Sequence, residues 1–388
     1  MKRKLSEICR FYSGTGFPTV YQGKINDELP FYKVGDIASN VNLGNIYLKN
    51  CNNYISRKEA EEIKGTIVPK DTIVFAKIGE ALKLNRRAIT SCDCLIDNNV
   101  MGIEPIADII TTGYFFYFMK QLKLQKYAEK TTVPSVRKST LEQLDITVPT
   151  LEEQKEIELL LNKAAKLILL RKQELDQLDN LIKARFVEMF GDPLNPNKAN
   201  CYFTNCVEFN PKKSEINILN NLTVSFVPME CVGVDGSFCI KENGDISNYY
   251  KGYTYFRNGD VLLAKITPCF ENGKVAIAQG CTNDIGFGTT EFHVSRPISG
   301  LSNSCWIKYL LNNDRVHDLA TVNMTGSAGQ KRIQKAFFDK LKIYVPPIER
   351  QNEFASFVQQ VDKSKVAVQK SLDEAQLLFD SLMQQYFG

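Results

Sequence analysis

Two long stretches of the chain place a hydrophobic residue at every seventh position. In residues 151–191 good helix formers dominate, and neither proline nor glycine occurs before Gly191. Residues 347–388 show the same seven-residue spacing. A sustained period of seven predicts two helices that pack along a shared seam. The residues that we expect in this seam are Leu161, Ile168, Leu175, Leu178, Ile182, Val361, Val368, Leu372, Phe379 and Leu382.

Proline precedes each of these stretches and glycine ends it. Pro149 and Pro346 stand just before the expected helix starts, and Gly191 and Gly388 stand at the expected ends. At about 1.5 Å per residue each helix would span roughly 50–60 Å. An average helix has only about 11–12 residues. This length favours spacer helices, and the alternative is a pair of ordinary core helices in an α/β domain.

The remaining sequence, residues 1–150 and 192–346, has a different pattern of residues. Short β-branched or aromatic runs alternate there with turn signals rich in glycine and asparagine, which predicts small β-rich domains. Helical stretches are expected at residues 112–129 and 303–320. The runs that we expect to form strands include Thr66–Pro69, Thr72–Phe75, Val261–Ala264 and Val275–Ala278.

The chain also contains the same unit twice. Ile146–Gln154 aligns without a gap with Ile343–Gln351, at an offset of 197 residues, and this offset continues to the last residue. Upstream, Thr72–Ile78 resembles Asp260–Ile266 at an offset of 188 residues. A repeated unit must be recognised before any fold is assigned. The change of offset indicates that the first part of each unit has diverged in loop length, whereas the helical part has not.

These patterns together predict an α+β fold. We expect two small mixed α/β domains, related by the internal repeat and joined by two long antiparallel coiled-coil helices. The first domain is expected at residues 1–150 and the second at residues 192–346. The spacer helices are expected at residues 151–191 and 347–388.

Positive charge is concentrated in the two predicted domains. The chain carries a formal charge of +4, to which residues 1–150 contribute +5 and residues 192–346 contribute +2. The two helical stretches contribute −1 and −2. A polyanion would therefore bind to the domains rather than to the helices.

Two groups of polar side chains in each unit could contact such a polyanion. One group follows a predicted strand, and the other comes shortly before the long helix. Arginine can bind guanine, asparagine and glutamine suit adenine, and lysine neutralises phosphate; the alternative is a set of ordinary solvated loops. The candidates are Lys77, Lys83, Asn85, Arg86, Arg87, Ser135, Arg137 and Lys138 in the first unit, and Lys265, Thr267, Asn272, Lys274, Ser327, Gln330, Lys331 and Arg332 in the second.

Catalytic and metal-binding motifs are missing from the sequence. The eleven cysteines form no paired CxxC pattern, and His293 and His317 are the only histidines. No phosphate loop of the GxxxxGK[ST] type occurs, and the glycines of Gly14–Gly16 lead into proline instead of a dinucleotide-binding helix. No apolar run is long enough to cross a membrane, and no apolar segment follows the basic start of the chain. We therefore expect a cytoplasmic protein with neither a catalytic site nor a bound metal or cofactor.

The order of these features resembles the specificity subunit of type I restriction-modification systems. In that family a divergent unit of about 150 residues leads into a helix that begins with a Val-Pro-x-Leu-x-Glu-Gln motif, and the whole arrangement is repeated. The resemblance covers essentially the whole chain. Thr150 departs from it, because proline is common at this position in the family; the second copy does have Pro347 there. It is carried by Ile146–Gln154, Ile343–Gln351, Leu5–Ile8, Gly14–Pro18, Pro30–Ile37 and Phe226–Glu230.

The resemblance implies a non-catalytic, DNA-binding subunit. Its two domains would be target recognition domains, each reading one half of a bipartite, asymmetric site in double-stranded DNA. Its helices would fix the spacer and dock two modification (methyltransferase) subunits, which ATP-driven restriction subunits can join. S-adenosylmethionine, ATP and Mg would lie on those partners, and DNA methylation would be their chemistry. The alternatives are a non-catalytic protein-binding coiled-coil scaffold and a DNA-acting enzyme with an unrecognised site.

Overall fold

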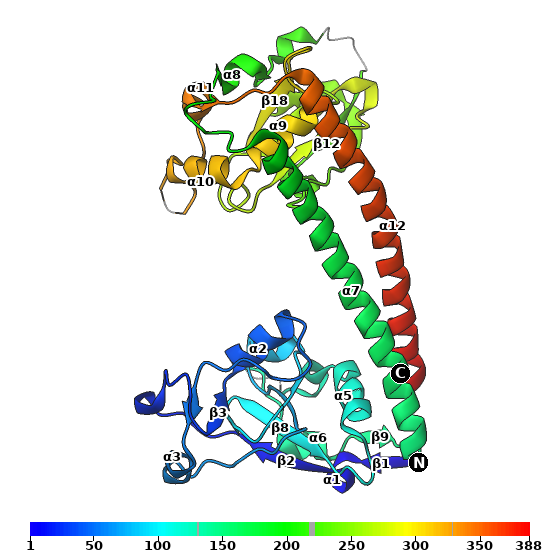
Figure 1. The fold of residues 1–388 in the computed structure, drawn as a ribbon. Coiled ribbons are helices and arrows are strands. Elements are labelled where there is room, and N and C mark those ends of the chain that lie inside the picture. The colour runs from blue at the N-terminus through cyan, green and yellow to red at the C-terminus, as the bar shows by residue number, and fades with distance from the viewer. Residues whose placement is uncertain (130–131, 217–221, 328) are drawn as a thin grey trace. The chain divides into compact units, whose positions relative to one another are not determined.

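The computed structural model describes residues 1–129, 132–216, 222–327 and 329–388, which form two compact units. Unit 1 comprises Met1–Gln173 and Gln369–Gly388, and unit 2 comprises Glu174–Val368. Each unit contains a mixed α/β domain and a part of each of two long helices (Figure 1). The predicted α+β fold class is confirmed.

The domain of unit 1 contains three small sheets. A four-stranded antiparallel sheet has the order β2-β8-β5-β6, and a three-stranded sheet has the order β4-β3-β7 with β3 parallel to β7. Strand β1 pairs with β9. The strands are β1 (Lys2–Lys4), β2 (Cys9–Ser13), β3 (Leu29–Tyr32), β4 (Tyr54–Ile55), β5 (Ile73–Ala76), β6 (Ala88–Ile89), β7 (Leu95–Ile96), β8 (Val100–Pro105) and β9 (Asp145–Thr147).

Short helices surround these sheets. Helix α5 buries four aromatic side chains and Met119 in the core that it shares with β5 and β8. The helices of this unit are α1 (Leu5–Ile8), α2 (Val34–Asn42), α3 (Arg57–Glu62), α4 (Glu80–Lys83), α5 (Thr112–Gln121), α6 (Lys138–Glu142) and the 3₁₀ helices η1 (Thr19–Tyr21) and η2 (Leu124–Tyr127).

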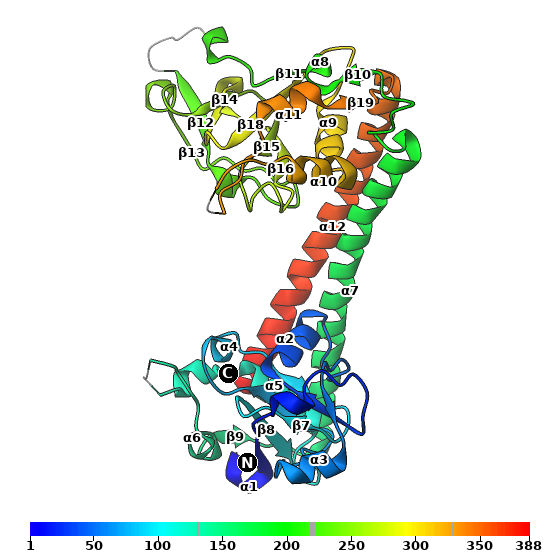
Figure 2. The ribbon, with the colours of Figure 1, turned by 90° about the vertical axis from the view of Figure 1, so that its left-hand side faces the viewer.

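The domain of unit 2 repeats this topology (Figure 2). Its sheets have the orders β11-β18-β15-β16, β13-β12-β17-β14 and β10-β19, so that β14 is the one addition among the described strands. Strand β12 is parallel to β17, as β3 is to β7. The strands are β10 (Cys201–Tyr202), β11 (Val207–Phe209), β12 (Thr223–Val227), β13 (Glu242–Asp245), β14 (Thr254–Phe256), β15 (Val261–Ala264), β16 (Val275–Ile277), β17 (Gly286–Gly288), β18 (Phe292–Pro297) and β19 (Lys342–Ile343).

Some helices of unit 2 correspond to those of unit 1. Helix α9 takes the place of α5 and buries Trp306, the largest fully buried side chain of the chain. The helices are α8 (Phe203–Cys206), α9 (Ser304–Leu311), α10 (Asp314–Val322), α11 (Lys335–Lys340) and the 3₁₀ helices η3 (Lys213–Glu215), η4 (Met229–Cys231), η5 (Ile246–Asn248) and η6 (Thr282–Asp284).

Three expectations about single elements need correction. Residues 112–129 form α5 and η2, because the chain is extended at Leu122 and Lys123. Residues 303–320 form α9 and α10, because the side chain of Asn313 accepts the N–H of Arg315 and starts a new helix. Thr66–Pro69 is not a strand, although Val68 bridges to Cys94.

The long helices are α7 (Leu151–Phe190) and α12 (Ile348–Phe387). In unit 1 the first half of α7 shares a core with the end of α12, where Leu161 and Met383 are buried. In unit 2 the second half of α7 shares a core with the start of α12, where Phe186 packs edge-on against Phe354. The two pairings together make the helices antiparallel. Gly191 follows α7 with a φ of 71°, a conformation that suits glycine at a helix end.

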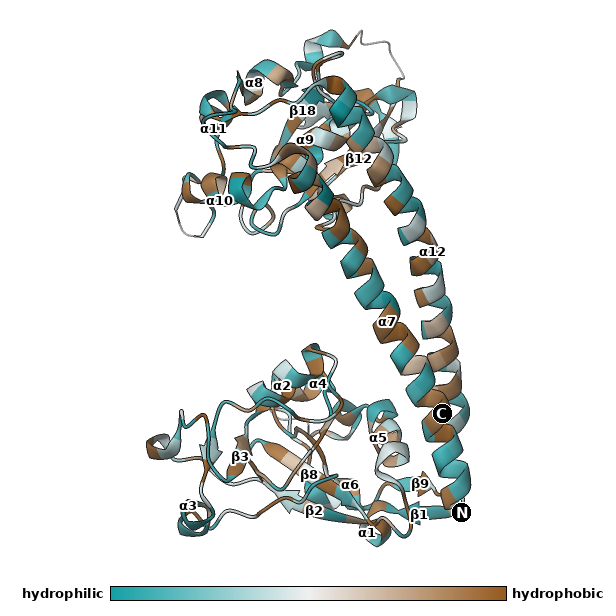
Figure 3. Ribbon diagram, in the orientation of Figure 1, coloured by the Kyte–Doolittle hydropathy of each residue, from teal (hydrophilic) through white to brown (hydrophobic). Residues whose placement is uncertain are grey.

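All ten predicted seam residues are shielded from solvent to some degree, and hydrophobic residues recur along both helices (Figure 3). Half of them are buried, namely Leu161, Ile182, Val361, Val368 and Leu372. The other half are partly exposed, namely Ile168, Leu175, Leu178, Phe379 and Leu382.

Candidate nucleic-acid interface

In unit 1 the first residue of one predicted group, Lys77, lies beside the other group, which begins at Ser135. The chain leaving β5 runs antiparallel to the segment that precedes α6, and Ile78 bridges to Ser135. Val136 donates its N–H to the carbonyl of Lys77 (2.9 Å), and Gly79 donates its N–H to Pro134 (2.8 Å). Residues more than 50 positions apart in sequence are thereby held in one short ladder.

Unit 2 builds the same ladder from the corresponding residues. Ile266 bridges to Arg332, Ile333 donates its N–H to the carbonyl of Lys265 (2.9 Å), and Thr267 donates to Lys331 (3.0 Å). The residues on one side of the ladder are related by the offset of 188, and those on the other side by the offset of 197. The two offsets seen in the sequence therefore belong to the two sides of one repeated structural feature.

The side chains at the ladder of unit 1 are cationic and accessible. Arg137 is exposed and forms an ion pair with Glu129. Lys138 pairs with Glu142 (3.6 Å) and lies over the ring of Phe11. Lys77 and Ser135 are partly exposed beside them. Since exposed ion pairs are weak, these cations can exchange their carboxylates for phosphates at little cost.

The ladder of unit 2 holds its arginine more firmly. The Nε and Nη2 atoms of Arg332 donate to both carboxylate oxygens of Glu291, at 2.9–3.1 Å. The Arg332 guanidinium lowers the pKa of Glu291, so this pair is ionised at neutral pH. Thr267 Oγ1 donates to the carbonyl of Gly329 (2.7 Å) and accepts the N–H of Lys331 (3.0 Å). Of the predicted contacts on this loop, Ser327, Gln330 and Lys331 are exposed.

A buried histidine, His293, is hydrogen-bonded to the same loop at Ile333. His293 accepts a hydrogen bond from Asn210 at Nδ1 (3.2 Å) if its proton is on Nε2, which then donates to the carbonyl of Ile333 (3.0 Å). Burial lowers the pKa of His293 to about 4, so the ring is neutral at physiological pH. His293 thus ties the segment that carries Arg332 to β18.

One predicted DNA contact is contradicted by the structure. Arg87 is 4% exposed and donates to the carbonyls of Met119 (3.1 Å) and Leu122 (3.1 Å) and to Oδ1 of Asn85 (2.8 Å). Its guanidinium lies over the ring of Phe75. Burial lowers the pKa of Arg87 to about 9, which leaves it charged at neutral pH. Arg87 caps the end of α5 and cannot reach DNA.

Asn85 has a related structural role. It adopts a φ of 54°, which asparagine tolerates better than most residues, and its amide donates to the carbonyl of Lys120 (3.3 Å). Its Oδ1 also accepts the N–H of Leu124. Asn85 and Arg87 therefore fasten the loop after β5 to the end of α5.

The other candidates of these two loops differ in exposure. Lys83 is exposed and pairs with Glu80 (2.6 Å), and Arg86 is partly exposed. Asn272 is exposed, whereas Lys274 is partly buried and donates to the carbonyl of Met229 (3.2 Å). Lys83, Arg86 and Asn272 remain candidate contacts, and Lys274 is engaged in holding η4.

Two glutamines that we did not single out from the sequence position the long helices. Gln154 and Gln351 are fully buried in the first turns of α7 and α12. The Gln154 amide donates to the carbonyls of Pro149 and Ile109, while its oxygen accepts the N–H of Thr111 (2.8 Å). Gln351 makes the same set of bonds in unit 2, where its oxygen accepts the N–H of Asn303 (3.0 Å). The signal was present, because the glutamine is identical in the two copies at the offset of 197.

A cross-strand ion pair is also repeated, with its charges exchanged. In unit 1 Arg10 on β2 faces Glu104 on β8. In unit 2 Glu208 on β11 faces Arg296 on β18. The attraction across the sheet is thus the same in both units, although the residue at each of the two positions differs. Sequence identity therefore does not reveal this part of the repeat.

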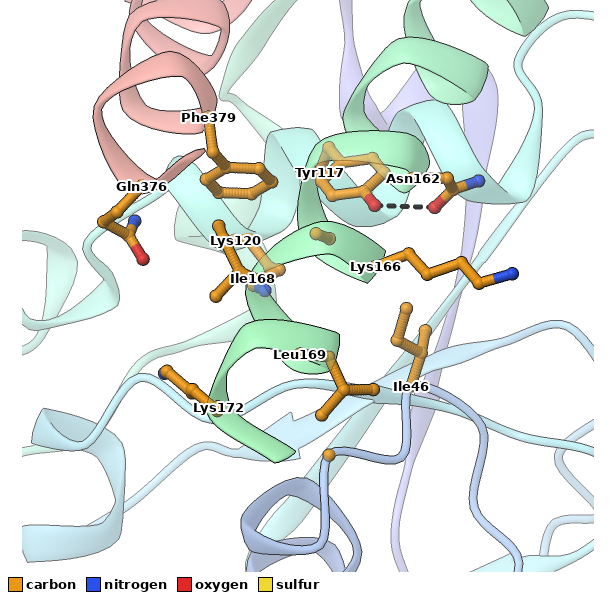
Figure 4. Close-up of a pocket in the computed structure, with 12 residues that line it drawn as sticks. Ile46, Tyr117, Lys120, Asn162, Lys166, Ile168, Leu169, Lys172, Gln376 and Phe379 are labelled. Atoms are coloured by element: carbon orange, nitrogen blue, oxygen red, sulfur yellow. Dashed lines mark hydrogen bonds between the residues drawn. The ribbon is translucent and has the colours of Figure 1, made fainter. Parts of the chain in front are cut away.

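Unit 1 contains a pocket of about 440 Å³ between α5, α7, α12 and residues 44–46 (Figure 4). Tyr117 donates to Oδ1 of Asn162 (2.6 Å) at its wall, and Phe379 reaches it from α12. Its charged lining residues are Lys120, Lys166 and Lys172. Its other lining residues are apolar, apart from Tyr117, Asn162 and Gln376.

Metal ligands and membrane spans are the two remaining features of interest. Outside residues 130–131, 217–221 and 328, no group of histidine, cysteine, aspartate and glutamate side chains is placed to hold a metal ion. No helix in the same part of the chain is long and apolar enough to cross a membrane.

The sequence matches a family whose description fits this duplicated architecture. The profile of the type I restriction modification DNA specificity domain matches residues 1–180 and again residues 195–375. The chain belongs to this family. The two matches together cover most of the chain, and each contains one complete ladder and the start of one long helix.

The sequence matches to curated members of the family cover between 41% and 68% of this chain. The specificity subunit of the type I restriction enzyme EcoAI from Escherichia coli is 41% identical over 192 residues, which are 46% of this chain and 31% of that protein. The EcoEI specificity subunit from the same organism is 40% identical over 168 residues, covering 41% of this chain and 28% of that protein. The MjaIX specificity subunit from Methanocaldococcus jannaschii is 23% identical over 277 residues, covering 68% of this chain and 56% of that protein. The chain thus matches about a third to a half of the length of these relatives.

Solved structures of the family share the fold. The S subunit of a type I restriction-modification system from M. genitalium superposes with a TM-score of 0.56 at 12% identity, covering 100% of this chain and 96% of that one. A chain from a structure of complex assembly and conformational transition in a type I system has the same TM-score at 17% identity, covering 100% and 97%. At such identities the likeness concerns the fold alone.

Proposed function

We propose that this protein is the DNA-reading specificity subunit of a type I restriction-modification complex. Each domain reads one half of a bipartite, asymmetric site in double-stranded DNA. The observation that carries this proposal is the repeated ladder, because it places Lys77 beside residues 135–138 in unit 1 and Lys265 beside residues 330–332 in unit 2. Arginine, glutamine, serine and lysine side chains provide both base-reading and phosphate-binding groups.

Helices α7 and α12 serve as the spacer and as the docking surface for two modification subunits. Several apolar side chains on them face solvent, which supports a role in protein binding. The most exposed of these are Leu159, Leu170, Val187, Val366, Leu377 and Leu378.

The chemistry belongs to the partners in this proposal. The modification subunits supply S-adenosylmethionine and flip the target adenine out of the duplex. Restriction subunits, where they join, supply the ATP- and Mg-dependent steps. The specificity chain binds none of these cofactors and works in the cytoplasm, where the DNA is.

A methylome tests this proposal. Cells that express the chain with its modification subunit are compared with cells that lack the chain. We expect a new split motif with adenine methylated in both halves, and exchange of residues 1–150 for those of another family member should change one half only. A stable complex without new methylation, or the absence of any complex, would contradict the proposal.

A further inference from the structure

The end of α5 and the loop after β5 carry a concentration of positive charge. Residues 81–92 and 112–127 contain six lysines and arginines and no acidic residue. The corresponding segments of unit 2, residues 269–280 and 304–319, contain three cations and three acidic residues. The contrast between the units is therefore six charges in two short segments that occupy equivalent places in the fold.

The structure joins these two segments into one surface. Helix α4 contacts η2, and the hydrogen bonds of Asn85 and Arg87 to residues 119–124 lock the loop to the helix end. Asn85 and Arg87, which the sequence suggested as DNA contacts, thus hold the loop against the helix end. Their bonds fix the place from which Arg86, Lys123 and Lys126 project.

These three cations are accessible to solvent. Lys123 and Lys126 are exposed and line a common shallow pocket, and Arg86 is partly exposed. Among the described residues, no carboxylate lies within ion-pair distance of any of the three; Lys83 beside them is paired with Glu80. Like charges held together without counter-ions repel one another, and an external anion would relieve that repulsion.

We propose that Arg86, Lys123 and Lys126 form a phosphate-contacting surface that unit 1 has and unit 2 lacks. The polyanion is the DNA backbone next to the half-site that unit 1 reads, so this inference rests on the proposed function. Contacts to phosphates add affinity without sequence information. Of the two units, unit 1 therefore makes the larger electrostatic contribution to DNA affinity.

The test is the salt dependence of DNA binding by the complex of the full chain with its modification subunit. The triple variant Arg86→Gln, Lys123→Gln and Lys126→Gln is compared with the wild type on a duplex that contains the recognised site. Each lost phosphate contact makes the slope of log K against log salt shallower by about 0.9. We expect the slope to become shallower by roughly 2–3, with the methylated motif unchanged.

A matched variant controls for the loss of net charge. Arg57→Gln, Lys58→Gln and Lys64→Gln remove the same charge from α3 and the turn that follows it, and α3 lies far from α4 within unit 1 (Figures 2 and 3). The control should change the slope by less than one.

Three outcomes would overturn the inference. The first is an unchanged slope in the test variant, and the second is equal change in the test and control variants. The third is loss of the modification subunit instead of loss of DNA affinity, which would assign the surface to a protein. A wild-type complex that binds no DNA would instead refute the proposed function itself.

Discussion

The two units place different side chains at equivalent positions of the same sheet. Leu263 of β15 pairs with His293 of β18, and Phe75 of β5 pairs with Met101 of β8. The histidine binds the ladder segment through Ile333, whereas the methionine fills the core of unit 1. Unit 2 has thus replaced an apolar contact with a polar one directly behind its ladder.

The exchanged ion pairs differ in the same way. Arg10 is 70% exposed in its pair with Glu104 (3.8 Å). Arg296 is 16% exposed and, besides Glu208, makes two hydrogen bonds of 2.9 Å to the buried carboxylate of Asp260. The position of Asp260 is occupied in unit 1 by Thr72, which is satisfied by backbone and threonine oxygens. The arginine of this ion pair is therefore exposed to solvent in unit 1, whereas in unit 2 it neutralises a buried carboxylate.

The largest difference is expected on removal of the arginine from the unit 2 pair. Arg296→Ala leaves Asp260 buried without its counter-ion, which should destabilise unit 2 by about 3–5 kcal/mol. The matched change Arg10→Ala in unit 1 removes an exposed arginine from its pair with Glu104 and should cost about 1 kcal/mol or less. Hydrogen exchange in the full chain measures both, because it reports each unit separately. Equal costs would show that the two pairs are energetically alike.

The next effect concerns the hydrogen bonds by which Arg87 of unit 1 holds the end of α5. Arg87→Ala leaves the carbonyls of Met119 and Leu122 without their donor in a buried place, and we expect a cost of about 2–4 kcal/mol. Exchange should accelerate at residues 119–124 and leave unit 2 unchanged. Arg87→Gln keeps part of the side chain and should cost less. An Arg87→Ala chain with native stability but weakened DNA binding would restore Arg87 as a contact.

The smallest effect is a pH dependence confined to unit 2. Burial lowers the pKa of His293 in the folded state to about 4, from an ordinary value of 6.5. The folded state is therefore more stable when the His293 ring is neutral than when it is protonated. That stabilisation is complete above pH 6.5 and is lost as the pH falls toward 4, by up to about 3 kcal/mol.

The variant His293→Met, which installs the residue of unit 1, isolates this contribution. It should be less stable at pH 7, because Ile333 and Asn210 lose their partner, but its stability should fall less between pH 6.5 and 4. Exchange rates in unit 2 at several pH values give the comparison. An identical pH dependence in the variant would exclude His293 as its source.

The repeat and the long helices could be predicted from sequence because they depend on local periodicity. The seven-residue spacing, the prolines before the helices and Gly191 after α7 are read directly along the chain. The joining of Lys77 to Val136 could not be predicted, because a hydrogen bond across the fold leaves no local pattern. Burial explains the error at Arg87, since an arginine in a basic run resembles a surface residue until its partners are known.

Paired shortening of the two helices tests most directly the central claim that the units read DNA and the helices set the spacing. Arg171 on α7 donates to Ser371 on α12 (3.1 Å), so residues 168–174 and 368–374 lie opposite each other. Deleting both segments removes one heptad from each helix and preserves the seam, and shortens the pair by about 10 Å. At about 3.4 Å per base pair this predicts a methylome in which the gap is about 3 bp shorter and both half-sites are unchanged. An altered half-site with the original gap would contradict the account.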